Sequence, residues 1–162
     1  MLRVAPPAGL TVGPALATGL ALLRYSAFAD CPSLETLRAR YAEERPELLE
    51  HHVNLLVTQR PDGDLIVGDT HRYGAGSAPF REERLDELLL EEGAALLGVD
   101  ELSVRERWLG VYAWASDREA LVATPCDGVR AVSVTSGIGM TTALGLAPRV
   151  LDELLDPRPA YT

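Results

Sequence analysis

Apolar and polar residues alternate most clearly in the middle of the chain. Within His52–Arg60, every second residue from Val53 to Val57 is apolar, which is the period of a β-strand. The segment Pro61–Asp64 then combines proline, glycine and two aspartates, the residue types of a tight turn, and Leu65–Thr70 is β-like again. The pattern predicts an antiparallel hairpin.

Three other segments repeat apolar residues at helical spacing. The first covers residues 33–46, begins at a serine that can cap it and stops at a proline. The second, Glu82–Leu97, carries an apolar stripe of leucines. The third spans Met140–Leu155. Because Pro148 lacks a backbone donor, we expect a break near Leu146 and a second helix that starts at the proline.

The remaining β-like segments are Thr18–Phe28, Val104–Ala115, Ala120–Thr124 and Val129–Thr135, preceded by an extended Pro/Gly-rich lead-in over residues 1–17. Strands joined by hairpins, with helices between them, predict an α+β fold with a mostly antiparallel sheet and helices on one face. The alternating βαβ rhythm of a doubly wound nucleotide-binding fold is not found in the sequence.

Composition and charge exclude several functions. The 162 residues carry a net charge of −9, which argues against a nucleic-acid partner or an anionic membrane. All 15 basic residues are arginines, so P-loop and Schiff-base lysine chemistry is excluded within this sequence. Cys31 and Cys126 lie far apart and no metal-ligand spacing occurs, so we expect no metal and a reduced, cytoplasmic protein.

The strongest candidate site is the segment in which Val129–Thr135 passes through Gly137 and Gly139 into the last helix. A strand that turns through glycines into a helix directs several backbone N–H groups, and the positive end of the helix, at one point. The segment therefore predicts a site for an anion or a polar ring edge. The alternative is that the glycines only allow a tight connection.

Three further side chains are candidate substrate contacts. Tyr112 shares one strand face with Trp108 and Trp114, so this aromatic row is either core or the lining of a pocket. His71 lies where the predicted hairpin runs into a Gly-rich loop, a common place for site residues. Arg107 can hold an anionic group bidentately, or it is a surface arginine paired with a carboxylate.

Residues Arg107–Tyr112 (RWLGVY) and Val132–Thr141 (VSVTSGIGMT) resemble the C-terminal half of FAD-dependent oxidoreductases of the D-amino acid oxidase/glycine oxidase type. The likeness extends upstream through Leu65–Thr70 to Met1. It implies FAD as the cofactor and hydride transfer from an amine or amino acid, a reaction that relies on positioning, so no catalytic side chain is assigned. It also implies that one turn lies against the pyrimidine edge of the flavin: Thr135, Ser136, Gly137, Ile138, Gly139, Met140 and Thr141.

The sequence departs from that family in two ways. It contains no G-x-G-x-x-G unit for the ADP half of FAD, so residues 1–130 would form a substrate-binding domain and residues 131–162 a strand-turn-helix that returns to an FAD domain. A Rossmann-type FAD-binding polypeptide would complete the site. Tyr112 stands where glycine-oxidase-like members carry a carboxylate-binding arginine. This favours an amine with another anionic group, such as an aminophosphonate, over a plain α-amino acid.

Two other interpretations stay open. In the first, the chain is a non-catalytic α+β binding or assembly domain. In the second, it is a truncated remnant that cannot bind FAD alone. Without the covering FAD domain, an apolar face around the last strand and helix would be exposed. We therefore expect self-association, as a homodimer, if the chain occurs by itself.

Overall fold

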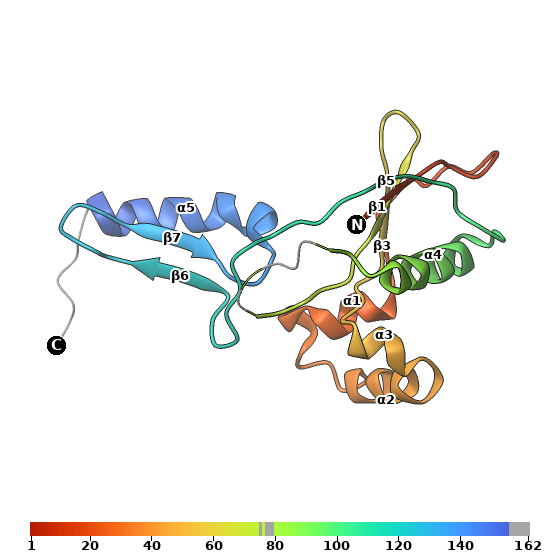
Figure 1. Ribbon diagram of the computed structural model, residues 1–162. Helices are drawn as coiled ribbons and strands as arrows, with labels where there is room; N and C mark the ends of the chain where they lie inside the picture. Colours follow the sequence, from red (N-terminus) through yellow and green to blue (C-terminus); the bar gives the residue numbers. More distant parts are fainter. Residues whose placement is uncertain (75, 77–79, 156–162) are drawn as a thin grey trace. The chain divides into compact units, whose positions relative to one another are not determined.

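The computed structural model describes residues 1–74, 76 and 80–155 (Figure 1). The chain divides into two compact units, Met1–Gly110 and Val111–Thr162. This division comes earlier than the boundary after residue 130 that the sequence suggested.

The first unit is built on a five-stranded sheet in the order β2-β3-β4-β1-β5. Each neighbouring pair of strands is antiparallel, which confirms the predicted α+β class with an antiparallel sheet. The strands are β1 (Leu2–Val4), β2 (Leu16–Ala17), β3 (Leu56–Gln59), β4 (Leu65–Gly68) and β5 (Val104–Arg107).

The predicted hairpin is confirmed as β3 and β4. Its turn closes when the backbone N–H of Arg60 donates to the carbonyl of Asp64 at 2.8 Å and that of Gly63 donates to Arg60 at 2.9 Å. Gly63 has a φ of +92°, a conformation that glycine adopts without a Cβ penalty. The turn chemistry therefore sets the register of the two strands.

The start of the chain is not the extended lead-in that its prolines and glycines suggested. Strand β1 lies between β4 and β5, with Leu2 opposite Val67 and Val4 opposite Leu65. Both β1 residues are fully buried. Arg3, between them, points to the other face, where its Nε donates to the Asp64 carboxylate at 2.6 Å.

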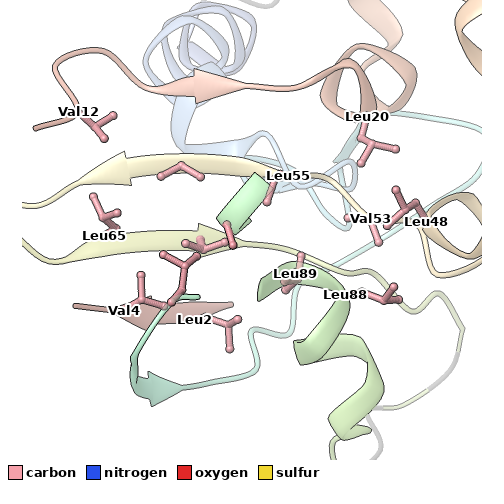
Figure 2. Close-up of a cluster of buried hydrophobic side chains, with 14 residues drawn as sticks. Leu2, Val4, Val12, Leu20, Leu48, Val53, Leu55, Leu65, Leu88 and Leu89 are labelled. Carbon is pink, nitrogen blue, oxygen red and sulfur yellow. The ribbon is translucent and has the colours of Figure 1, made fainter. Parts of the chain in front are cut away.

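One face of the sheet carries the core (Figure 2). Strand alternation brings Leu2, Val4, Val57, Leu65 and Val67 to this face. The predicted helix over Glu82–Leu97 is confirmed as α4 (Glu83–Leu97), and its Leu88 and Leu89 are buried in the same cluster. The face that holds Arg3 is half-buried or exposed.

Three short helices form a group beside the strands (Figure 1). They are α1 (Gly19–Arg24), α2 (Leu34–Glu44) and α3 (Pro46–Glu50), with a 3₁₀ turn at Ser26–Phe28. Helix α2 confirms the helix predicted over residues 33–46, but the Ser33 side chain makes no capping hydrogen bond. The strand predicted over Thr18–Phe28 is wrong, because most of this segment forms α1 and the 3₁₀ turn. Its leucines and alanines are good helix formers, and the first helical turn closes when the N–H of Ala21 donates to the carbonyl of Thr18.

Strand β5 is much shorter than the predicted Val104–Ala115. It pairs with β1, which is only three residues long, and ends at Arg107. Trp108, Tyr112 and Trp114 are all exposed, so the interpretation of this aromatic row as core is wrong.

The second unit consists of a two-stranded hairpin and one long helix. Strands β6 (Ala120–Ala123) and β7 (Ala131–Val134) pair antiparallel, as predicted. Helix α5 runs without a break from Gly139 to Leu155, so the expected break near Leu146 is wrong. Pro148 removes one backbone donor, but the rest of the helical ladder continues past it.

Candidate functional site

The glycine turn of the second unit has the strand-to-helix geometry that the sequence predicts. Gly137 follows β7 with a φ of +78°, and α5 begins two residues later at Gly139. The N–H groups of Thr141 and Thr142 both donate to the carbonyl of Ile138 at 3.1 Å. The N–H groups of Gly139 and Met140 lie ahead of this first helical bond, at the positive end of a 17-residue helix.

Side chains before the glycines support this turn from behind. The Thr135 hydroxyl donates to the carbonyl of Arg118 at 2.7 Å, and the Ser136 hydroxyl donates to that of Glu119 at 3.3 Å. Thr135 is also buried. These two side chains tie the turn to the segment before β6.

The outer face of α5 is apolar and exposed. Met140 is 97% exposed and Leu144 is 88% exposed, and Leu151 and Leu155 continue the same stripe. Val150 is the buried side chain of this helix among the residues that the structure describes. A hairpin that is covered by one helix has little core of its own, and this unit leaves a continuous helical stripe facing outward.

The predicted substrate residue His71 belongs to a polar cluster in the first unit. Its side chain is 5% exposed, and its Nε2 lies 3.5 Å from the Asp69 carboxylate. Asp69 also accepts from the side-chain amide of Asn54 at 3.1 Å. The backbones of Asn54 and Asp69 exchange two hydrogen bonds of 2.7 Å, which extend the β3–β4 ladder and position both side chains.

The surroundings of His71 favour the neutral form of its imidazole. Burial is the main cause and lowers the pKa of the imidazole below its ordinary value; the Asp69 carboxylate partly opposes this, and the charge of Arg24 adds to it. The other ring nitrogen, Nδ1, lies 3.2 Å from the backbone carbonyl of His52. A proton on Nδ1 makes that contact a hydrogen bond and leaves Nε2 as a base beside Asp69.

A cavity of about 280 Å³ adjoins this cluster. Its polar lining comes from Arg24 on α1, Arg38 on α2, His52 after α3, and Tyr73 after β4. The Tyr73 ring stacks on His71 with the ring centres 6.0 Å apart, and it meets the ring of His52 in a T-shaped arrangement with the ring centres 5.0 Å apart. Tyr73 therefore links the cavity to the His71 cluster.

Arg107 is engaged by α4. Its guanidinium lies 2.9 Å from the Glu83 carboxylate and 2.9 Å from that of Asp86, whose side chain is 4% exposed. Arg81 pairs with Asp86 as well. These contacts match the interpretation of Arg107 as an arginine paired with carboxylates.

The three predicted substrate residues are divided between the two units. His71 and Arg107 lie in the first unit and in different clusters, and Tyr112 lies in the second unit. The sequence pattern does not single out Arg24, Arg38 and His52, because they come from separate segments of the chain and share no motif. Their basic side chains are the one feature of the sequence that could have pointed to this lining.

Comparison with known proteins gives no relative: no protein-family model, curated protein or solved structure matches the chain. The described residues contain no group of three or more His, Cys, Asp or Glu that could hold a metal ion. Within the same residues, none of the helices is both long and apolar enough to cross a bilayer. Function therefore has to be inferred from the residues and their contacts.

Proposed function

We propose that the chain is a subunit or part of an FAD-dependent oxidoreductase that oxidises an amine or amino acid and works with a Rossmann-type FAD-binding polypeptide. The observation that carries the proposal is the turn from β7 through Gly137 into α5. It presents backbone donors at the end of a long helix. The resemblance of Val132–Thr141 to the flavin-edge turn of such enzymes supports it.

The residues at the turn fit a flavin chemically. A bound flavin would supply the hydride acceptor for amine oxidation, and its reduced form would carry negative charge along the pyrimidine edge. Donors at a helix N-terminus stabilise such charge by on the order of 1–2 kcal/mol in partly buried geometry. Gly137, Ile138, Gly139 and Met140 would hold the ring edge through their backbone, and Thr135 and Ser136 would brace the turn.

The exposed stripe of α5 supports a second polypeptide in the complete site. Met140 lies on this stripe at the first turn of the helix, beside the proposed flavin edge. A partner that covers the stripe would also exclude water from the turn. Tyr112 and His71 stay proposed substrate contacts, whereas Arg107 would reach a substrate only by giving up its ion pairs with α4.

The test is co-expression of the chain with a G-x-G-x-x-G polypeptide, first the one encoded by the neighbouring reading frame. We expect a yellow complex that oxidises primary or secondary amines, and no flavin on the chain alone. Met140→Glu should reduce the flavin content of the complex more than Met140→Gln does, because only the glutamate also places a negative charge at the turn. A complex that never forms, or equal flavin in both variants, would count against the proposal.

The same stripe also favours the second candidate function, a non-catalytic assembly domain. Its apolar surface calls for a partner whether or not a flavin is bound. The co-expression experiment separates the two functions. A stable complex without flavin absorbance or amine oxidation supports assembly, and a flavin-containing active complex supports the oxidoreductase.

A further inference from the structure

The cavity in the first unit has a lining of one charge sign. Arg24, Arg38 and His52 contribute basic groups, and none of the described lining residues is acidic. The whole chain carries a net charge of −9, so a basic cluster of this kind departs from the average surface. Clefts with one sign of charge and apolar walls concentrate ions of the opposite sign.

Two carboxylates lie close to residues of this lining or to their neighbours. Glu35 lies 4.0 Å from Arg38 along the exposed surface of α2, a weak contact between two solvated groups. Asp69 is engaged by His71 and by the amide of Asn54. Arg24 is held over the ring of Tyr25, with its guanidinium carbon 5.1 Å from the ring centre. Each arginine has a local contact that helps to place it, and both belong to the lining of the cavity.

The floor of the cavity is part of the hydrophobic core. Leu20, Leu48 and Val53 line it, and Figure 2 shows them at one end of the buried cluster. The volume of about 280 Å³ lies at the small end of the range for ligand pockets. Basic groups above an apolar floor match a small molecule with a charged head and a short apolar arm.

We infer that this cavity binds a small organic oxyanion, a phosphonate, phosphate ester or carboxylate with a short apolar chain. Arg24, Arg38 and His52 would bind the oxyanion, Tyr73 would close one side, and the leucines of α1 and α3 would receive the chain. All these residues belong to the first unit, so binding requires neither the flavin nor a partner.

The test is titration of the ¹⁵N-labelled chain with propylphosphonate, butyrate, inorganic phosphate and butanol, followed by amide chemical shifts. We expect saturable shifts around Leu48, Leu49 and Val53 with the organic anions and weaker binding of butanol. The tighter of propylphosphonate and butyrate identifies the head group. No saturation with either anion, or equal binding of butanol, would overturn the inference.

Two variants on α2 separate a specific site from bulk electrostatics. Arg38→Gln removes a lining charge and should weaken binding about ten-fold, as expected for a lost charge-assisted hydrogen bond. Arg40→Gln removes the same charge from a residue that pairs with Glu44 along the helix and does not line the cavity. An equal loss in both variants would refute the site. Circular dichroism confirms that each variant is folded.

Discussion

Substitution of Leu144 tests whether the second unit needs a partner that covers the apolar stripe of α5. The side chain is 88% exposed in the middle of the apolar stripe of α5, between Met140 and Leu151. Leu144→Gln keeps a good helix former at this position and removes only apolar surface. The free energy of unfolding should therefore change by less than about 0.5 kcal/mol, the usual limit for a surface substitution.

The expected effect on association is much larger. Complete burial of a leucine side chain contributes about 1.5–3 kcal/mol. Because about 1.4 kcal/mol corresponds to a factor of ten in an equilibrium constant, loss of this burial should weaken association about 10- to 150-fold. A symmetric homodimer buries two copies of the side chain, so the effect there would be larger still.

Sedimentation velocity of the chain over a range of concentrations measures this effect. The unaltered chain should self-associate at tens of micromolar, and Leu144→Gln should shift it toward monomer. Asp152→Asn, an exposed polar change on the same helix, is the control and should leave association unchanged. A concentration-independent monomer, or a Leu144→Gln protein that associates as well as the parent, would refute the conclusion that this stripe is an interface.

Three further predictions concern stability. Gly137→Ala should lower the unfolding free energy by about 1–2 kcal/mol, because the φ of +78° disfavours a Cβ. Gly145→Ala, in open space within α5, should raise it by about 0.5–1 kcal/mol. Denaturant titration compares the two variants, and equal effects would contradict the conformational explanation. Leu48→Ala should lose about 2–5 kcal/mol, because the side chain is fully buried, and a smaller loss by the same titration would mean that the cavity collapses. Burial lowers the pKa of His71 below 6.5, so the unfolded chain takes up this proton first as the pH falls. The unfolding free energy should therefore fall below about pH 7 by at most about 1.4 kcal/mol per pH unit, and His71→Gln should flatten this dependence; an unchanged pH profile would show that His71 is not responsible.

Elements with strong local signals were predictable from the sequence. The β3–β4 hairpin follows from strict alternation and a Pro/Gly turn, and α4 follows from a long leucine stripe. The turn at Gly137 and the helix after it were also identified, because a strand, two glycines and a helical pattern stand next to each other in the chain.

Elements whose structure depends on distant partners were not predictable. Strand β1 has only three residues, and its strand character comes from pairing with β4 and β5, roughly 60 and 100 residues away. The length of β5 is limited by the short β1 with which it pairs, and no local pattern in the sequence indicates this limit. The cavity was missed for the same reason, because its basic residues come from separate segments of the chain. Tertiary contacts decided each of these features.

The position of β1 also constrains the order in which the first unit can fold. Leu2–Val4 are made before both of their partner strands, β4 and β5, and β5 ends only at Arg107. The β3–β4 hairpin can form as soon as it is made, whereas the edge next to β1 stays open until almost the whole unit has been synthesised. A growing chain therefore exposes an unpaired strand edge until β5 has been made. Aggregation during expression is expected to start at that edge, even though the finished sheet covers it.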